Sequence, residues 1–555
     1  MAVGVGGLLV GAGATGGVAA DTDATAAWVP AADDKVDVQV LEALDERGRA
    51  EFWVRFEARP DLASLAGIED WSQRGQAVHQ ALTSTAEDSQ ARVRAELEVD
   101  GIAYDAYFIS NAIHVPAGDE SLVSSLVARP EVEGIYPSVD YELPDPVESD
   151  PIFVPSVVEW GVADINADDV WSGFGVQGEG IVVANIDTGV QFDHPALVEQ
   201  YRGNDRDGSF IHDYNWFDAS GVGSDEPVDF EAHGTHTMGT MVGGDGGSNQ
   251  IGVAPGAKWI AANGCCPSDE ALIASGEWML APTDLAGENA DPDQRPHVIN
   301  NSWGSGIPTN DPFMEDVSEA WAAAGIFGMW ANGNSGPACE TSGSPGSRII
   351  NYSAGNYDIN HEINSSSGRG PGQDGETKPN ISAPGTDVRS SVPGNGYEAF
   401  TGTSMAAPHT AGAVALLWSA APDLIGDIEL TKDLLDDSAV DSPDEQCGGT
   451  DDDNNVFGEG RLDALALLQA APIGDVGTLE GTVTEAGSGV PVAGATVTLT
   501  GERERSVRTD AEGAFRVRVS SGDHTVTVAK FGYVTDTGTI TVPVDDTVTY
   551  DVVLQ

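Results

Sequence analysis

Short apolar runs that alternate with helical patterns mark the middle of the chain. Four such runs lie at 181–186, 259–262, 298–300 and 326–330. Strands that are apolar on both faces are typical of a parallel sheet covered by helices on both sides. We therefore predict an α/β domain over 159–472. In such sheets the reactive side chains gather where the strands end, at their carboxyl edge.

Residues 35–143 carry a different pattern, in which strand-like and helical periodicities follow one another. Phe52, Val54 and Phe56 are spaced as on one face of a strand, and apolar residues recur at helical intervals between Val78 and Leu97. These periodicities predict a small α+β unit, with strands at 52–56, 107–115 and 132–139 and helices at 78–97 and 119–128.

Beyond Leu468 the helical pattern stops, and residues 477–555 are rich in valine and threonine. Turn signals such as Gly487-Ser488-Gly489 divide this stretch into short strands. Strands at this spacing predict an all-β sandwich. No catalytic constellation appears in it, so we expect a stabilising or surface-binding role.

The charge balance narrows the range of functions. The 555 residues include 25 basic and 89 acidic side chains, which gives a net charge of −64. Nucleic acids and anionic membranes would repel such a surface. A hydrophobic content of 40% argues against disorder. We expect a folded protein that needs concentrated salt to screen its own repulsion, as halophilic proteins do. The alternative is an acidic secreted protein without salt adaptation.

The first 26 residues are expected to be a secretory signal segment. They are Gly/Ala-rich and end on small residues suited to cleavage, although no Lys or Arg precedes the apolar part. The segment is a poor membrane anchor, because glycines interrupt it, and no later window qualifies as a transmembrane span. We expect an exported protein that is extracellular or associated with the cell surface. The proline-rich, acidic stretch 144–158 should be an extended, exposed linker.

Four cysteines, at 265, 266, 339 and 447, allow three complete pairings in an exported chain. Their spacing does not fit a zinc site, because two are adjacent and no Cys-x-x-Cys or histidine pair accompanies them. We expect one or two stabilising disulfides, and the sequence does not determine which cysteines pair.

Four short motifs of the central region carry candidate chemistry. Ser404 opens a long apolar segment, so helix N–H groups would point at its hydroxyl. A carboxylate, an imidazole and an amide precede it, in Asp187-Thr188-Gly189, His233-Gly234-Thr235-His236 and Gly333-Asn334-Ser335-Gly336. Amide hydrolysis requires a nucleophile, a base, a group that orients the base, and donors for the oxyanion. The four motifs contain one side chain for each of these tasks.

Together these motifs, in this order, resemble the subtilisin-like serine peptidase family. The sequence around these motifs, including IVVANIDTGVQFDHPAL and VINNSWG, looks most like the bacillopeptidase F branch of that family. Asp before His before Ser is the order given for subtilisin among known triads. The resemblance implies a catalytic triad of Asp187, His233 and Ser404, with Asn334 as the oxyanion donor and His236 as a structural residue. No cofactor is required for this chemistry.

The resemblance also implies partners and a substrate-binding region. Polypeptides would be the substrates. They would be held by an edge segment at Ser302, Trp303 and Gly304 and by a pocket at Ala331, Asn332 and Gly333. The unit at 35–143 resembles the inhibitory propeptides of the family, which the enzyme itself would remove by cleavage in or just before the linker. The alternative is an accessory domain that stays in the mature protein. Residues 477–555 resemble the carboxypeptidase regulatory-like domain.

Calcium is the one metal that the resemblance suggests. Family members often bind it through an aspartate nine residues after the catalytic one, but that position is Ala196 here. The runs Asn204-Asp205-Arg206-Asp207-Gly208 and Asp451 to Asp453 are acidic enough to hold calcium. In so acidic a chain, solvated loops are the alternative interpretation.

The sequence does not fit two other classes of protein, an α/β-hydrolase esterase and a non-catalytic adhesion protein. An α/β-hydrolase esterase requires Gly-x-Ser-x-Gly with the serine before its partners. Here Ala406 replaces the second glycine and Ser404 comes last. A non-catalytic adhesion protein would be expected to lack a member of the triad, and none is missing. The sequence therefore favours an exported endopeptidase.

Overall fold

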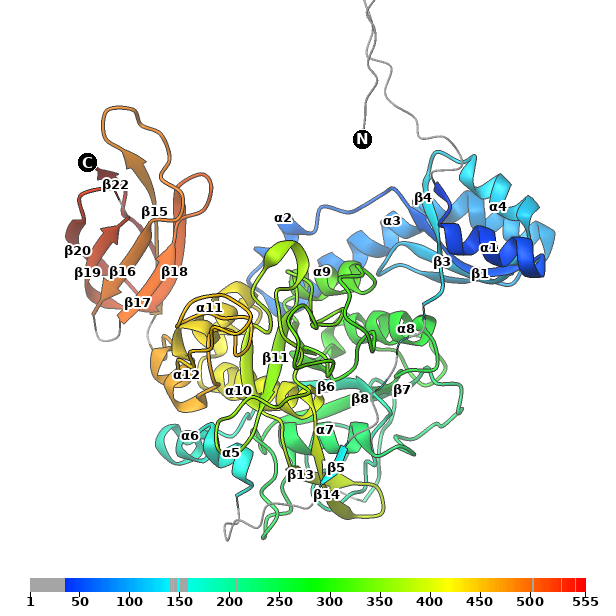
Figure 1. The fold of residues 1–555 in the computed structure, drawn as a ribbon, viewed down its shortest axis with the longest axis horizontal. Helices are drawn as coiled ribbons and strands as arrows, with labels where there is room; N and C mark the ends of the chain where they lie inside the picture. Colours follow the sequence, from blue (N-terminus) through cyan, green and yellow to red (C-terminus); the bar gives the residue numbers. More distant parts are fainter. Residues whose placement is uncertain are drawn as a thin grey trace, which may run out of the picture.

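The computed structural model describes residues 35–139, 141, 143, 147–149, 158–205, 208–474, 476–501, 504–530, 532–544 and 546–555. The expected signal segment at 1–26 and most of the linker at 144–158 lie outside these residues. The described chain forms an N-terminal α+β unit, a central α/β domain and a C-terminal region of β-strands (Figure 1).

A seven-stranded parallel sheet forms the centre of the molecule, as predicted. Its strand order is β12 (Ile381–Pro384), β11 (Tyr352–Tyr357), β10 (Phe327–Ala331), β9 (Val298–Asn301), β6 (Val182–Asp187), β8 (Lys258–Asn263) and β7 (Trp216–Asp218). The four apolar runs of the sequence are β6, β8, β9 and β10. The sequence did not predict β7, β11 and β12. The strand β11, for example, reads YSAGNY and has no apolar run, although all six of its residues are buried.

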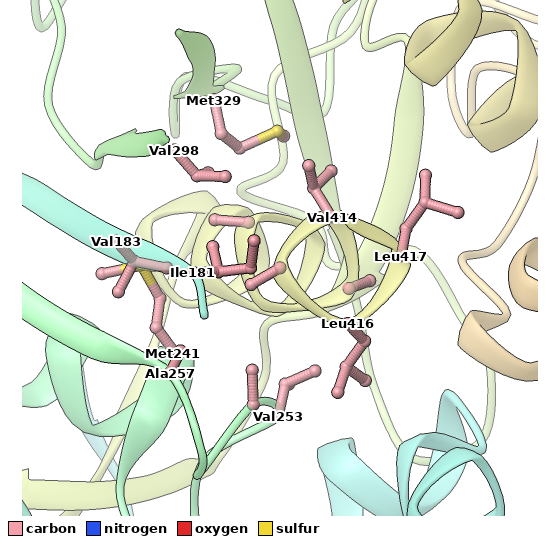
Figure 2. Packing of buried hydrophobic residues seen from close by; sticks show 14 of the residues in the cluster. Ile181, Val183, Met241, Val253, Ala257, Val298, Met329, Val414, Leu416 and Leu417 are labelled. Carbon is pink, nitrogen blue, oxygen red and sulfur yellow. The ribbon is translucent and has the colours of Figure 1, made fainter. Parts of the chain in front are cut away.

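Helices cover both faces of this sheet. On one face lie α7 (His233–Val242) and α10 (Thr403–Ala420), and on the other α8 (Asp269–Leu280) and α9 (Glu315–Ala323). Adjacent residues of β6 belong to different cores, with Val183 packed on the α10 side and Ala184 on the α8 side. Figure 2 shows Val414, Leu416 and Leu417 of α10 pointing into the core on the α10 side of the sheet. This helix is buried on all sides, which explains its lack of a polar face.

The N-terminal unit is a four-stranded antiparallel sheet with helices. Its strand order is β2 (Asp105–Tyr107), β3 (Ala112–Gly118), β1 (Ala50–Phe56) and β4 (Val132–Pro137). Its helices are α1 (Val38–Arg47), α2 (Ala63–Ala66), α3 (Trp71–Asp100) and α4 (Glu120–Val127). The predicted single strand at 107–115 is wrong, because a turn around Asn111, with φ of 44°, divides it into the hairpin of β2 and β3. The first helix, α1, was not predicted.

Part of the predicted linker is a strand rather than a free extended segment. The strand β5 (Val147–Ser149) pairs antiparallel with β14 (Gly396–Thr401), which also pairs with β13 (Val388–Val392). The strand β14 leads directly into α10. The N-terminal segment is therefore bound beside the start of the helix that carries Ser404.

The C-terminal region is rich in β-strands, as predicted. One sheet contains β15 (Val476–Glu485), β18 (Ala514–Ser520), β21 (Thr547–Thr549) and β22 (Val552–Leu554). The other contains β16 (Thr496–Thr500), β17 (Glu504–Arg508), β19 (Gly522–Ala529) and β20 (Asp536–Val542). Alternate residues of both sheets share one apolar core, which includes Leu479, Val497 and Val526.

Two disulfides connect the four cysteines. Cys339 is joined to Cys447 across a sequence separation of 108 residues, and Cys265 is joined to its neighbour Cys266. Of the three pairings that the sequence left open, the structure has this one. In the described part of the chain, no helix combines the length and the apolar character that a bilayer-spanning segment needs.

Candidate active site

A buried carboxylate and a buried imidazole form the centre of the site. Asp187 is the last residue of β6 and His233 the first of α7, and both are at most 1% exposed. The Asp187 Oδ1 lies 2.8 Å from the His233 Nδ1. Because an ionised carboxylate can only accept hydrogen bonds, Nδ1 carries the proton in this pair. The lone pair of the neutral ring is then on Nε2, where a base would need it.

Neighbouring groups hold Asp187 in place. Its Oδ1 also accepts from the Thr188 backbone N–H at 2.8 Å, and its Oδ2 accepts from the Thr237 hydroxyl at 3.2 Å. Burial lowers the pKa of His233, but the negative charges of Asp187, Asp229 and Glu231 outweigh this effect and leave the pKa above its usual value. The protonated imidazole that a proton transfer creates would thus be stabilised.

Asp229 supports the turn that leads to His233. It accepts from the Thr235 hydroxyl at 2.6 Å, from the Thr235 N–H at 2.9 Å and from the Thr188 hydroxyl at 3.0 Å. Ala232, next to the histidine, has a left-handed φ of 73°, and its N–H donates to Asp229 Oδ1 at 2.9 Å. The sequence motifs did not indicate Asp229. An acidic side chain six residues before a buried Thr at a helix start is a weak signal in a chain with 89 carboxylates.

The second histidine of the motif has a different environment. The His236 ring is fully buried, and its Nε2 is 2.9 Å from the Val388 carbonyl. Burial and the nearby His233 lower its pKa to about 3, so it is neutral and its proton faces a carbonyl oxygen. This arrangement fits a structural role.

Ser404 is the second residue of α10 and is 4% exposed. Its hydroxyl donates to the Ser302 carbonyl at 3.0 Å, and the Ser302 hydroxyl donates to the Ser404 carbonyl at 2.8 Å. Within the described residues, no hydrogen bond joins Ser404 to His233. The serine hydroxyl is thus directed toward the Ser302 carbonyl in this structure.

The amide of Asn334 is oriented by the residue before the serine. Its Oδ1 accepts from the Thr403 N–H at 2.9 Å and from the Thr403 hydroxyl at 3.0 Å. Since a backbone N–H can only donate, these contacts identify the oxygen of the amide. Among the described residues, the Asn334 Nδ2 donates no hydrogen bond, so it remains available as a donor. Asn334 and Ser404 line the same cavity, of about 130 Å³.

Most of the predicted substrate-binding residues line this cavity. Trp303, Gly304, Ala331 and Gly333 are in its wall. Ser302 and Asn332 are not among the lining residues, and both are fully buried. The Asn332 Nδ2 instead donates to the Ser342 hydroxyl at 3.0 Å and to the Gly368 carbonyl at 2.8 Å, so its side chain braces the loops behind the wall. The cavity is also lined by residues that the sequence motifs did not indicate: Ser305, Gly306, Ile307, Ser335, Thr341 and Gly343.

Two acidic runs, at 204–208 and 451–453, are the candidate calcium sites of the sequence. In the first run, residues 206 and 207 lie outside the described residues. In the second, Asp453 accepts from the Thr377 hydroxyl at 3.0 Å. Over the described ranges, three side chains with metal-binding atoms come together at one place, which lies outside both acidic runs and is formed by Asp105, His114 and Glu270.

Comparison with known proteins identifies the class to which this fold and site belong. Residues 178–460 match the Subtilase family, and residues 478–555 match the carboxypeptidase regulatory-like domain. The family match covers more than half of the chain. The protein therefore belongs to the subtilase family, a family of serine proteases, and has its α/β fold.

Several relatives are similar over long stretches. Bacillopeptidase F of Bacillus subtilis (strain 168) is 35% identical in an alignment of 494 positions, which covers 82% of this chain and 34% of that protein. The chain thus spans about a third of the length of that relative. Subtilisin Savinase of Lederbergia lenta is 33% identical over 262 residues, covering 47% of this chain and 84% of the relative.

A solved structure shares the overall fold. The crystal structure of fervidolysin from Fervidobacterium pennivorans, described as a keratinolytic enzyme related to subtilisin, aligns with a TM-score of 0.54 and 18% identity. The alignment covers 90% of this chain and 78% of that one. At this identity the similarity concerns the fold alone.

Proposed function

We propose that the protein is a secreted serine endopeptidase in which Ser404 is the nucleophile, His233 the base and Asp187 the residue that orients it. The observation that carries the proposal is the buried 2.8 Å contact of Asp187 with His233, at the same sheet edge as the cavity that Ser404 and Asn334 share. Membership of the subtilase family supports the same assignment.

The reaction follows from these positions. The Ser404 Oγ attacks the peptide carbonyl carbon while its proton passes to the His233 Nε2, and the carbonyl oxygen becomes an oxyanion. The Asn334 Nδ2 and the Ser404 backbone N–H would stabilise that charge. The C–N bond then breaks, the imidazolium gives its proton to the leaving amine, and an acyl-enzyme remains. Water deacylates it by the same steps, with His233 again as the base.

The N-terminal unit is proposed to be an inhibitory propeptide. It is anchored on α8, where Asp269 accepts from the Trp53 indole N–H and the Val139 N–H, both at 2.8 Å. On the same helix, the partly buried Glu277 accepts from the N–H groups of Phe108 and Ile109, at 2.7 and 3.1 Å. Buried charge-assisted contacts of this kind favour the docked state.

The end of this unit reaches the substrate-binding region. Tyr141 is 3% exposed and packs against Phe313 and against Trp303 of the cavity wall, with ring centroids 4.4 and 6.0 Å apart. A few residues later, β5 pairs with β14, directly before Ser404. The chain is thus held on both sides of the serine. We propose that the enzyme cleaves itself between residues 143 and 147 and is released as a mature protease.

Export and adaptation to high salt complete the proposal. The acidic surface, with a net charge of −64, supports a protein that folds and works at molar salt. The Gly/Ala-rich start of the sequence supports secretion. The role of calcium, if the acidic loops hold it, would be structural, because the chemistry above uses protein groups alone.

One experiment tests function and processing together. The full chain and Ser404→Ala are expressed in molar salt and compared for casein hydrolysis and for the N-terminal sequence of the purified product. The parent should be active and should begin between residues 144 and 147, while Ser404→Ala should be inactive and unprocessed. Ser488→Ala, in an exposed turn of the C-terminal region, is the matched control and should behave as the parent. Equal activity of Ser404→Ala would refute the mechanism, and an active product that retains residues 35–143 would make this unit an accessory domain.

A further inference from the structure

Three metal-binding side chains meet where the N-terminal unit contacts the central domain. Asp105 on β2 and His114 on β3 are directly opposite each other in the antiparallel hairpin. Glu270, the second residue of α8, faces them from the central domain. One ligand atom of each residue lies within 4.8 Å of those of the other two. In Figure 1, α8 lies beneath the sheet that contains β3.

His114 is buried, with one ring nitrogen satisfied and the other not. Its side chain is 3% exposed, and its Nε2 lies 3.0 Å from the Glu51 Oε1. Because the carboxylate accepts, the proton of a neutral ring is on Nε2. The Nδ1 then presents a lone pair toward the Glu270 Oε2 at 3.3 Å, and it has no hydrogen-bond partner within the described residues. A lone pair that faces a carboxylate is repelled unless a proton or a metal cation lies between them, and the contact of Nδ1 with Oε2 does not have the geometry of a hydrogen bond.

The two carboxylates are likewise arranged for a cation. The Glu270 Oε1 accepts from the Tyr107 hydroxyl at 2.9 Å, which leaves Oε2 directed toward His114. Asp105 is exposed, and a carboxylate oxygen of this residue lies within 4.8 Å of the metal-binding atoms of the other two residues. Among the described residues, no Lys or Arg forms an ion pair with either carboxylate. Within the described residues, His114 is thus the one basic side chain paired with Glu270.

We infer that Asp105, His114 and Glu270 bind a divalent metal ion, Zn²⁺ by the nature of the ligands, which links the N-terminal unit to α8. One imidazole and two carboxylates, with an exposed side for a water molecule, match a four-coordinate zinc site. Calcium and magnesium prefer oxygen ligands alone. Glu51 on the imidazole and Tyr107 on the carboxylate orient the ligands from outside, as such partners do in zinc sites.

The metal would strengthen the docked state. Two ligands belong to the N-terminal unit and one to the central domain, so the complete site exists only while the two are in contact. An ion that binds this state alone stabilises it in proportion to the logarithm of its concentration over its dissociation constant. If the proposed function is right, Zn²⁺ delays release of the propeptide and the onset of protease activity.

Metal binding is measured on full-length Ser404→Ala, in which the two parts stay covalently linked whatever the activity of the parent. The protein, in KCl buffer stripped of divalent ions, is titrated with Zn²⁺ in competition with a chromophoric chelator. One tight site per chain is expected. Adding Glu270→Gln or Asp105→Asn should weaken it by about tenfold or more, whereas His361→Gln, at an exposed histidine paired with Asp164, should leave it unchanged. Circular dichroism checks that each variant is folded.

Two further readouts keep the result unambiguous. Co²⁺ added to Ser404→Ala should give visible absorption bands of a low-coordinate site, and these should be absent after His114→Gln. Equal Zn²⁺ affinity in the ligand variants and in His361→Gln, or no tight site, would overturn the proposal and leave His114 as a protonated imidazole between carboxylates.

In the active parent, Zn²⁺ should lengthen the lag before casein hydrolysis, and Glu270→Gln should abolish this effect. Tight binding without a lag would overturn the regulatory role while retaining the site.

Discussion

The Asp187 carboxylate accepts the Nδ1 proton of His233 across 2.8 Å, at a place where both side chains are shielded from water. This contact fixes the tautomer of the imidazole and leaves its Nε2 unprotonated. Since Asp187 ends β6 and His233 begins α7, the position of this helix relative to this strand determines the geometry of the pair.

Replacing the carboxylate should therefore abolish most of the activity. Asp187→Asn keeps the size of the side chain, but its amide can stabilise the wrong tautomer, and the imidazolium loses its counter-charge. We expect kcat to fall by about 10⁴-fold, measured with a soluble peptide substrate. Asp193→Asn, at an exposed carboxylate of the next loop, should keep the parental kcat. A loss of less than tenfold for Asp187→Asn would contradict the assigned role.

The pH dependence of the mature enzyme should reflect the raised pKa of His233. The base must be neutral to accept the serine proton, so kcat/KM should decrease as the pH falls through a value above the usual 6.5 of histidine. The exposed Glu231 contributes to this shift, and Glu231→Gln should move the acidic limb to lower pH, most clearly at the lowest salt concentration that keeps the enzyme folded, where its charge is least screened. Glu226→Gln, at an exposed carboxylate of the same loop that does not affect the pKa of His233, is the matched control and should keep the parental profile. An unchanged profile in Glu231→Gln would show that its charge is screened.

Removal of the Asn334 amide should affect the reaction more than binding. Asn334→Leu deletes the donor that would face the oxyanion, and we expect kcat to fall by about 10² to 10³ with little change in KM. Because the side chain also accepts from Thr403, thermal unfolding of the variant is compared with that of the parent. A large rise in KM at constant kcat would instead indicate a role in ground-state binding.

The Cys339–Cys447 disulfide should make a large contribution to stability, because it links residues 108 apart in the sequence. Cross-linking such a long loop restricts the unfolded chain, and its loss typically costs about 2 to 5 kcal/mol. The double variant Cys339→Ser/Cys447→Ser should show this difference in denaturant unfolding at fixed salt. The bond between the adjacent Cys265 and Cys266 closes almost no loop, so the corresponding double variant should lose much less.

Salt should control both folding and activity. With a net charge of −64, self-repulsion is strong in dilute buffer and is screened within about 3 Å at 1 M salt. We expect the far-UV spectrum and the casein-hydrolysing activity to be lost together on dialysis to low salt. Choline chloride serves as a second screening salt, to separate screening from a specific effect of K⁺. Full activity in dilute buffer would refute halophilic adaptation.

Strong local patterns explain the parts of the fold that were predicted correctly. The apolar strands β6, β8, β9 and β10 are recognisable because both of their faces are buried, and α3 because its apolar residues recur with helical spacing. The strand β11 was missed, since small and polar residues fill its buried positions. The division of 107–115 into two strands depends on a left-handed residue, Asn111, which an uninterrupted β-like pattern conceals.

The sequence by itself determined the class of the protein and the chemistry that its residues can perform. Side-chain type, order and local periodicity are properties of the chain, and four short motifs were enough to propose Asp187, His233, Asn334 and Ser404. Only the tertiary structure decided which distant groups meet. It oriented the Asn334 amide through Thr403, turned the Ser404 hydroxyl toward Ser302 and brought Glu270 against His114. These three contacts join residues that are 69 to 156 positions apart in the sequence, and Asp187 and His233 are 46 apart. Such residues meet because whole helices and strands pack together, which local sequence patterns do not specify.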